Sequence, residues 1–286
     1  MPVATVICPT FNHGPTLRYS LPSALAQTVE DLELFVVGDG VPDVTREIVG
    51  ELCERDGRVR FFDNPKGERR GERHRHQAMA EAQGEVILYL SDDDLWLPNH
   101  AETLIAALEQ ADWAHTIPAW VLPDGQMGVN LVDLADTFFR DQVFRETRPP
   151  IPGLSQAGHT RALYEALPLG WNPAPEGLGS DLHMWRQILA IGWVTPRSVP
   201  AFTVLGFPSP ARPGWTAEQR ADELAAWAAK LSEPSGRAAL DRQVLATFAQ
   251  RGAWEEKHST LEREALEAKL RRGSLARALG WRLRAK

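Results

Sequence analysis

The chain has 286 residues, a net charge of −7, two cysteines, and a composition that is 43% hydrophobic and 24% charged. This is an ordinary globular composition, long enough for one large α/β domain with an appendage or for two smaller domains. The acidic balance argues against general nucleic-acid binding, and two cysteines supply neither a disulfide framework nor a zinc ligand set.

The first part of the chain alternates short apolar runs with segments of helical spacing. Strands are predicted at 3–8, 32–37, 58–62, 86–90 and 113–117. Helices are predicted between these strands. One has Leu17 on its apolar face, the next is capped by Asp43, the third ends near Gln83, and the fourth begins at Pro98. Apolar strands separated by helices are typical of a mainly parallel sheet that is covered on both faces. The sequence therefore predicts a doubly wound α/β fold.

The second part of the chain has a different pattern. Residues 118–180 are rich in Pro, Gly and Trp and weakly periodic, which favours loops and a few strands. A helix is predicted to begin near Asp181. Helical spacing then returns with few breaks, at 217–231, 236–250 and 254–272.

Polar residues follow three of the predicted strands, at 9–14, 38–43 and 91–94. In parallel sheets ligands bind at the carboxyl ends of the strands. The last of these loops holds three consecutive aspartates, and Mg²⁺ and Mn²⁺ prefer carboxylate ligands together with the phosphates of a nucleotide. The alternative is a solvated turn that caps the helix after Pro98.

Two segments carry a family resemblance. "VATVICPTFNHGPTLRYSLPSALAQTVEDLELFVVGDG" and "GEVILYLSDDDLWLPNH" closely resemble the opening and the Asp-x-Asp segment of glycosyltransferase family 2. The resemblance implies a GT-A fold, a doubly wound and mainly parallel sheet with helices on both faces and a helical C-terminal extension. It implies a nucleotide-sugar-binding half at 1–117, an acceptor-binding half at 118–215, and the extension with its basic tail at 216–286.

The resemblance also implies which side chains bind the nucleotide-sugar. These are Pro9, Thr10, Asn12, Asp39, Arg75 and Asp92. Asp39 matches the acid that hydrogen-bonds the base, and Arg75 is expected to pair with that acid or with a phosphate. The neighbouring cations Lys66, Arg69, Arg70 and Arg73 fit a diphosphate site, but solvated positions on a helix face are the favoured interpretation for them.

The same comparison assigns the metal site. Asp93 matches the metal-binding acid, with Mg²⁺ or Mn²⁺ as the cofactor. His183, two residues after Asp181, is a weaker candidate from its position alone, and a packed or surface position is the favoured interpretation for it. Asp94 is expected to be a turn residue or a helix cap. Two departures from the family pattern are Gly38 and Ser91, which stand where acids are usual and bear on the ribose contacts and on the metal's second carboxylate.

A third segment, "GLGSDLHMWRQIL", resembles the acceptor side of the family and aligns Asp181 with its general base. The chemistry needs such a group, because an acceptor hydroxyl must lose its proton as it attacks. The alternative is that Asp181 only caps a helix. Ser180 replaces the glutamate that usually precedes the base, and His159 is a further candidate for the acceptor wall.

The resemblance implies a metal-dependent glycosyltransferase, and an inverting one, because the sequence shows no independent nucleophile and the acceptor would displace the diphosphate in a single step. The donor would be a nucleoside diphosphate sugar, with UDP- or dTDP-sugars favoured, and the acceptor a saccharide, lipid-linked or small-molecule hydroxyl in cell-surface polysaccharide or glycoconjugate synthesis. One alternative is a nucleotide-sugar-binding protein that has lost catalysis. A sugar nucleotidyltransferase fits less well, because "CPTFNHGPT" replaces its glycine-rich loop.

The basic tail at 269–286 has two interpretations. Its leucines recur every four residues among arginines beside Trp281, as in a helix on an anionic membrane surface. The other interpretation is a solvated terminus. The first eight residues lack a signal-peptide pattern, and no apolar run would span a bilayer. Because two cysteines, Cys8 and Cys53, give no disulfide framework, we expect a cytoplasmic protein, with peripheral contact at the inner membrane face under the first interpretation. The sequence does not predict an oligomeric state.

Overall fold

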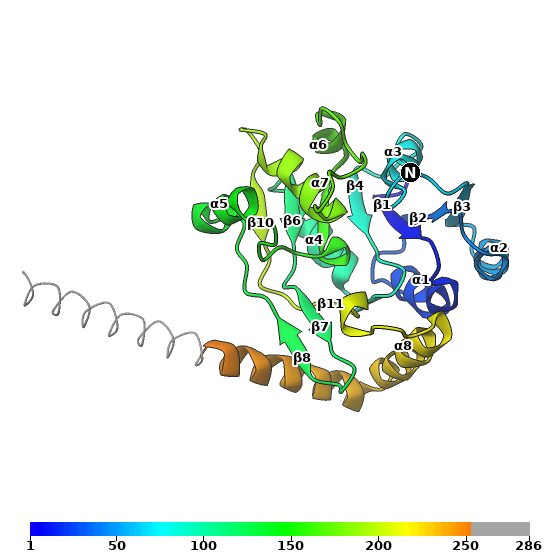
Figure 1. Ribbon diagram of the computed structural model, residues 1–286. Coiled ribbons are helices and arrows are strands. Elements are labelled where there is room, and N and C mark those ends of the chain that lie inside the picture. Colours follow the sequence, from blue (N-terminus) through cyan, green and yellow to red (C-terminus); the bar gives the residue numbers. More distant parts are fainter. Residues whose placement is uncertain (253–286) are drawn as a thin grey trace, which may run out of the picture. The chain divides into compact units, whose positions relative to one another are not determined.

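The computed structural model describes residues 1–252 and divides the chain into a unit of Met1–Arg237 and a unit that begins at Ala238. The first unit is built around a seven-stranded sheet in the order β10-β6-β9-β4-β1-β2-β3 (Figure 1). Its strands are β1 (Ala4–Thr10), β2 (Leu32–Asp39), β3 (Val59–Asn64), β4 (Val86–Tyr89), β6 (Trp113–His115), β9 (Ala157–Thr160) and β10 (Pro196–Ser198). The predicted α/β fold class is confirmed.

The sheet is mostly parallel. Strands β4, β1, β2 and β3 run parallel to one another, whereas β9 is antiparallel to both β4 and β6. In register, Thr10 at the end of β1 pairs with Gly38 near the end of β2. The carboxyl ends of these strands, and the loops that follow them, therefore meet at one edge of the sheet.

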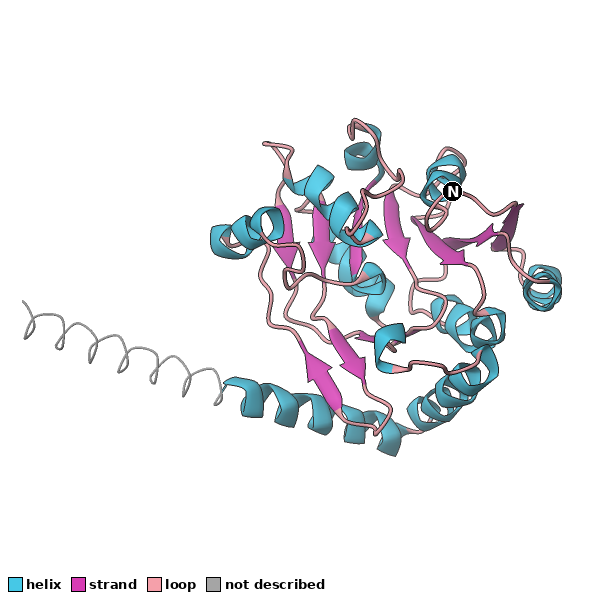
Figure 2. Cartoon of the chain, viewed as in Figure 1, coloured by secondary structure: helices cyan, strands magenta, loops and turns pink. Residues whose placement is uncertain are grey.

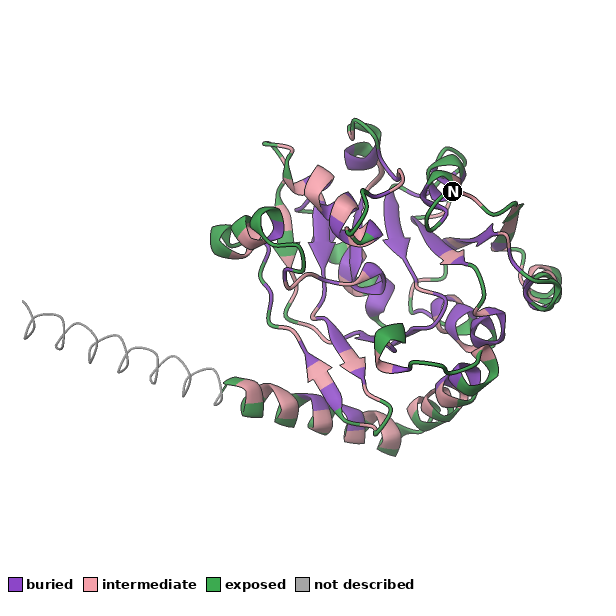
Figure 3. Cartoon of the chain, in the orientation of Figure 1, coloured by how far each residue is buried: buried purple, intermediate pink, exposed green. Residues whose placement is uncertain are grey.

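Helices cover both faces of the sheet (Figure 2). Side chains alternate across β1, so that Val6 and Cys8 join one core cluster and Ile7 joins the other. The first cluster includes residues of α1 (Leu17–Leu25), α2 (Asp43–Arg55) and α4 (His100–Leu108). The second includes residues of α3 (Glu72–Met79), α5 (Thr137–Arg145), α6 (Arg161–Glu165) and α7 (Ser180–Leu189). The central strands are buried on both sides, as Figure 3 shows.

Smaller elements complete the first unit. The short pairs are β5 (Leu95–Trp96) with β11 (Val204–Leu205) and β7 (Ala119–Val121) with β8 (Met127–Val129), and the 3-10 turns are η1 (Gly14–Thr16), η2 (Leu154–Gln156) and η3 (Ser209–Ala211). Helix α8 (Ala217–Ser232) begins with a capping box between Thr216 and Gln219. The backbone at 234–252 is helical. The helix predicted at 254–272 and the basic tail at 269–286 lie outside the described residues.

Three local predictions differ from the structure. Pro42 occupies the N-cap position of α2, and Asp43 is instead its first residue, paired with Arg46 at 2.7 Å. Helix α3 ends at Met79, short of Gln83. Residues 118–180 contain the unpredicted helices α5 and α6, since both are short and α5 exposes large apolar side chains that blur its pattern. None of the helices within residues 1–252 has the length and apolar character that a membrane crossing requires.

His159 on β9 gives the fold a testable pH dependence. It is fully buried, and burial lowers its pKa to about 4. Below about pH 6.5 the unfolded chain therefore binds a proton on His159, whereas the folded chain does not until the pH approaches 4. The contribution of His159 to the free energy of unfolding is therefore highest above about pH 6.5 and decreases as the pH falls toward 4. Relative to a His159→Gln variant, the wild type should lose about 3 kcal/mol of unfolding free energy between about pH 7 and about pH 4, measured by urea denaturation. A difference that does not change with pH would contradict this, and the exposed His76→Gln variant is the control.

Candidate active site

A cavity of about 1300 Å³ opens at the carboxyl ends of β1, β2 and β4. Its walls include eight side chains singled out in the sequence: Pro9, Thr10, Asn12, Asp39, Arg75, Asp92, Asp93 and Asp181. They come from segments as distant as the first strand and helix α7. The doubly wound fold thus collects them in one place, where such folds bind ligands.

Asp92 accepts hydrogen bonds on both its side chain and its backbone. Thr10 donates a hydrogen bond of 2.8 Å to its carboxylate, and Thr16 donates one of 2.6 Å to its backbone carbonyl. Both threonines are buried. The end of β1 and the turn after it therefore orient the first of the three aspartates.

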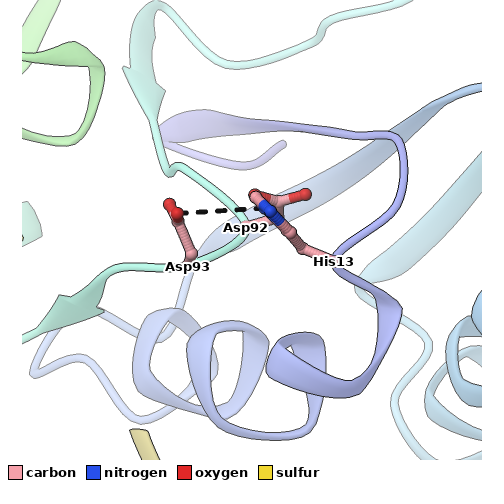
Figure 4. A group of neighbouring side chains, drawn as sticks. All are labelled: His13, Asp92 and Asp93. Carbon is pink, nitrogen blue, oxygen red and sulfur yellow. Dashed lines mark hydrogen bonds and ion pairs between the residues drawn. The ribbon is translucent and has the colours of Figure 1, made fainter. Parts of the chain in front are cut away.

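His13 stands beside two of these carboxylates (Figure 4). Its Nδ1 lies 3.1 Å from Asp92 Oδ1 and 3.8 Å from Asp93 Oδ2, and its hydrogen bond with Asp92 raises the pKa of the imidazole. One ligand atom from each of the three residues lies within 4.8 Å of the others. One imidazole nitrogen and two carboxylate oxygens at this spacing fit a divalent cation.

Asp93 is also paired with a cation from the chain. Arg220, in the first turns of α8, donates from Nη2 to Asp93 Oδ2 at 2.5 Å, and Ser209 lies 3.3 Å from the same oxygen. Burial raises the pKa of Asp93, with the charge of Asp92 adding to the effect and Arg220 opposing it. The guanidinium of Arg220 and a bound metal would thus compete for the carboxylate of Asp93.

Asp94 turns out to be a buried structural link. Its Oδ1 accepts a hydrogen bond of 2.9 Å from the Phe207 amide, and its Oδ2 accepts one of 2.5 Å from Ser155. Burial, and then the charge of Asp93, raises its pKa to about 7. The side chain connects β4 to the segment before η3, which is a larger role than the turn or helix cap expected from the sequence.

Asp39, at the end of β2, is engaged by the loop at 65–71. Lys66 Nζ lies 2.6 Å from its Oδ2, and the Gly67 amide donates to its Oδ1 at 2.7 Å. Gly71, with φ of +68°, approaches so closely that a Cβ there would lie 2.7 Å from the Asp39 carboxyl carbon. Lys66 is thus an ion-pair partner as well as a partly solvated side chain, and Arg75 is not the partner of Asp39.

Arg75 is a deeply buried member of the cavity wall. It is 3% exposed, its guanidinium carbon sits 4.2 Å from the ring centroid of Trp171, and it donates to the Arg70 carbonyl at 3.1 Å. Half-buried Asp181, in the first turn of α7, has its pKa raised by burial, while the charges of Arg75 and Arg70 act against that rise. A carboxylate with a raised pKa is a stronger base than an exposed one.

Next to Asp181, a buried carboxylate contacts Ser180. Glu72 is 1% exposed, and its Oε1 accepts a hydrogen bond of 2.5 Å from Ser180 Oγ. Its Oε2 accepts one of 2.9 Å from the Arg70 amide. Glu72 therefore ties the start of α7 to α3, at the position where the sequence lacks the expected glutamate.

The structure leaves two histidine candidates apart from these groups. His183 does not line the cavity, and its Nε2 lies 3.2 Å from Asn172 Oδ1, so the imidazole beside the aspartates is that of His13. His159 is buried against Tyr89, with a hydrogen bond of 2.6 Å, and is also absent from the cavity walls. It belongs to the core.

The family model described as "Glycosyl transferase family 2" matches residues 5–159, more than half of the chain. The chain belongs to glycosyl transferase family 2. The matched range contains Asp39, Asp92 and Asp93, whereas Asp181 and Arg220 lie beyond it.

Curated proteins of this type resemble the chain over part of their length. The GalNAc(5)-diNAcBac-PP-undecaprenol β-1,3-glucosyltransferase of Campylobacter jejuni is 31% identical over 115 residues, 40% of this chain and 37% of that protein. The succinoglycan biosynthesis protein ExoW of Rhizobium meliloti is 32% identical over 98 residues, 34% of this chain and 31% of that protein. The chain thus spans well under half of the length of these relatives.

Solved structures share the fold of this chain. TarS 1–349 of S. aureus, in complex with UDP-GlcNAc, superposes with a TM-score of 0.57 at 18% identity and covers 76% of this chain and 61% of TarS 1–349. The mannosyltransferase PcManGT of Pyrobaculum calidifontis, in complex with GDP-Man and Mn²⁺, gives 0.50 at 19% identity, over 86% of this chain and 81% of its own. At these identities the likeness establishes the fold.

Three side chains of this candidate site were not predicted from the sequence: His13, Glu72 and Arg220. His13 lies in the polar loop at 9–14 that was recognised as a strand end, so that loop was the available signal. Glu72 and Arg220 sit on helices among other charged residues, where nothing in the local pattern separates a buried charge from a solvated one.

Proposed function

We propose that the chain is a metal-dependent, inverting glycosyltransferase that moves a sugar from a nucleoside diphosphate to an acceptor hydroxyl. The observation that carries the proposal is that Asp39, Asp92, Asp93 and Asp181 line the same cavity. Within it, the acidic groups at the ends of β2 and β4 are the candidates for donor binding, and the acid of α7 is the candidate for proton transfer. Family membership supports the same reaction class.

In the proposed reaction, the acceptor oxygen forms a bond to the anomeric carbon as the bond from that carbon to the diphosphate breaks. The diphosphate leaves with the bonding electrons, and the hydroxyl proton passes to Asp181. A single displacement inverts the anomeric carbon. The raised pKa of Asp181, caused by burial, suits it to accept this proton.

The metal would be held by His13, Asp92 and Asp93, and when bound it would supply charge stabilisation for the leaving diphosphate. An imidazole nitrogen among the ligands suits Mn²⁺ better than Mg²⁺, because Mg²⁺ strongly prefers oxygen. Ser91, in place of an acid, supplies no carboxylate, so His13 would complete the set. The Mn²⁺ in the complex of PcManGT is consistent with this choice.

Donor and acceptor can be proposed at the level of chemical class. We favour a UDP- or dTDP-sugar donor, in line with the UDP-GlcNAc complex of TarS. For the acceptor we favour a lipid-linked saccharide, because the relative in Campylobacter jejuni is named for a reaction on a PP-undecaprenol compound. Contact of the tail at 269–286 with a membrane would suit such an acceptor and stays a prediction from the sequence.

The first experiment is a thermal-shift panel of UDP-, dTDP- and GDP-sugars with and without Mn²⁺. A ligand that binds only the folded state stabilises it by RT ln(1 + [L]/Kd), so a hundredfold excess over Kd adds about 2.7 kcal/mol and should raise Tm by roughly 5 °C. We expect the largest shift with a UDP- or dTDP-sugar and Mn²⁺ together. No shift with any donor would overturn the proposed function.

Binding without catalysis is the second candidate. It is favoured by one observation, namely that Asp39 and Asp93 already have the chain's own cations, Lys66 and Arg220, as partners. A metal-dependent thermal shift, with no hydrolysis of the donor and no transfer to any acceptor, would establish this alternative.

A further inference from the structure

Arg220 is a buried cation at the edge of the candidate active site. It is 3% exposed, and besides Asp93 its guanidinium donates to Ser209 Oγ and to the Phe207 carbonyl, each at 2.5 Å. Its Nη1 also lies 3.4 Å from His13 Nε2. The Nε atom is buried and has no hydrogen-bond partner in the described structure. The guanidinium therefore reaches two of the three candidate metal ligands.

The position of Arg220 is well defined. The capping box at Thr216 fixes the start of α8. Arg212, which precedes α8, forms a bidentate ion pair with Glu223 on that helix, at 2.5 and 2.7 Å. Arg212 also donates to the Val121 carbonyl at 2.9 Å. These contacts tie α8 to the wall of the cavity and leave the guanidinium of Arg220 facing Asp93.

Two cations cannot use Asp93 equally well at the same time. The oxygen that accepts the 2.5 Å hydrogen bond from Arg220 is the same one that lies 3.8 Å from His13 in the candidate metal cluster. A guanidinium so close repels a divalent cation, and the repulsion is strong where side chains are shielded from water. A diphosphate offers that guanidinium another partner, since arginine forms charged, bidentate hydrogen bonds with phosphate oxygens.

We propose that Arg220 is a diphosphate-binding residue that couples nucleotide binding to metal binding. Without ligand, Arg220 neutralises Asp93. When the diphosphate binds, Arg220 exchanges the carboxylate for phosphate oxygens and leaves Asp93 available to the cation. This inference rests on the proposed function and adds to it a binding group from α8, outside the residues that the family model matches. The coupling is reciprocal, because each ligand must raise the affinity of the other by the same factor.

The test compares the wild type with Arg220→Gln, using two separate titrations. Binding of Mn²⁺ alone is followed by the EPR signal of the free ion, and binding of UDP or inorganic pyrophosphate is followed by calorimetry in a chelator. The loss of one charged hydrogen-bond partner predicts about tenfold tighter Mn²⁺ binding and about tenfold weaker binding of both anions. Lys230→Gln removes the same charge from an exposed position of α8 and should change neither constant.

The outcomes separate this inference from the proposed function. If the wild type binds Mn²⁺ and UDP and Arg220→Gln leaves both constants unchanged, the inference is wrong and the function stands. If pyrophosphate binds through Arg220 while no nucleoside diphosphate binds, the anion site is supported and the nucleotide assignment fails. If Arg220→Gln does not fold, Arg220→Lys is used instead, because lysine keeps the positive charge but cannot form the bidentate hydrogen bonds of a guanidinium. Unchanged anion binding in Arg220→Lys overturns the inference.

Discussion

Asp181→Asn is expected to abolish most glycosyl transfer while leaving donor binding intact. Asparagine has nearly the same shape, so it can keep its place in the first turn of α7, but it cannot take the acceptor proton. General base catalysis contributes a factor of roughly 100 to 10,000, and we expect kcat to fall by that much. Transfer assays would give kcat, and calorimetry with the donor and Mn²⁺ would give the binding constant.

The pH profile adds a second measurement to this prediction. Because burial raises the pKa of Asp181, the acid limb of wild-type kcat should lie above the range of an ordinary carboxyl group. That limb should be missing from the residual activity of the variant. The same substitution at Asp222, exposed on α8, is the control and should leave kcat unchanged. Wild-type turnover by Asp181→Asn would remove Asp181 from the role of base.

Asp93→Asn is expected to remove the Mn²⁺-dependent part of donor binding and to destabilise the fold. The variant loses a candidate metal ligand, and it leaves the guanidinium of Arg220 buried without its counter-ion. Removing one member of a buried pair costs about 3–5 kcal/mol, and the remaining amide oxygen should hold the loss near the lower figure. Urea denaturation would measure the stability, and thermal shifts with donor, with and without Mn²⁺, would measure the metal response.

The double variant Asp93→Asn/Arg220→Gln separates these two effects. With both charges gone, much of the lost stability should return, whereas the Mn²⁺ response should stay absent. A metal response in Asp93→Asn equal to that of the wild type would show that Asp93 is not a ligand. A single variant as stable as the wild type would show that the ion pair with Arg220 contributes little.

The alternation of apolar strands and helices was sufficient to predict the fold class. Strands buried on both faces are apolar at almost every position, and this pattern survives in β1, β2 and β4 because both faces are covered by helices. The elements of 118–180 were predicted poorly. Helix α5 exposes Phe138 and Phe144, so its apolar residues do not form a single stripe.

The candidate site likewise has a part that could be predicted from the sequence and a part that could not. Asp39 ends β2, and Asp92 and Asp93 lie just after β4, so their place at the edge of the sheet could be predicted from local sequence. The partners of these acids could not. Arg220 contacts Asp93 although the two residues are 127 positions apart in the sequence, and such a contact depends on how helix α8 packs.

The sequence alone determined the layered α/β architecture and the residue types at the ends of its strands, because periodicity and strand ends are local properties of the chain. Only the tertiary structure decided which charges meet. It paired Asp39 with Lys66 and Asp93 with Arg220, and it placed His13 beside the aspartates in preference to His183. The physical reason is that a buried charge requires a partner, and here packing brings that partner from a distant segment.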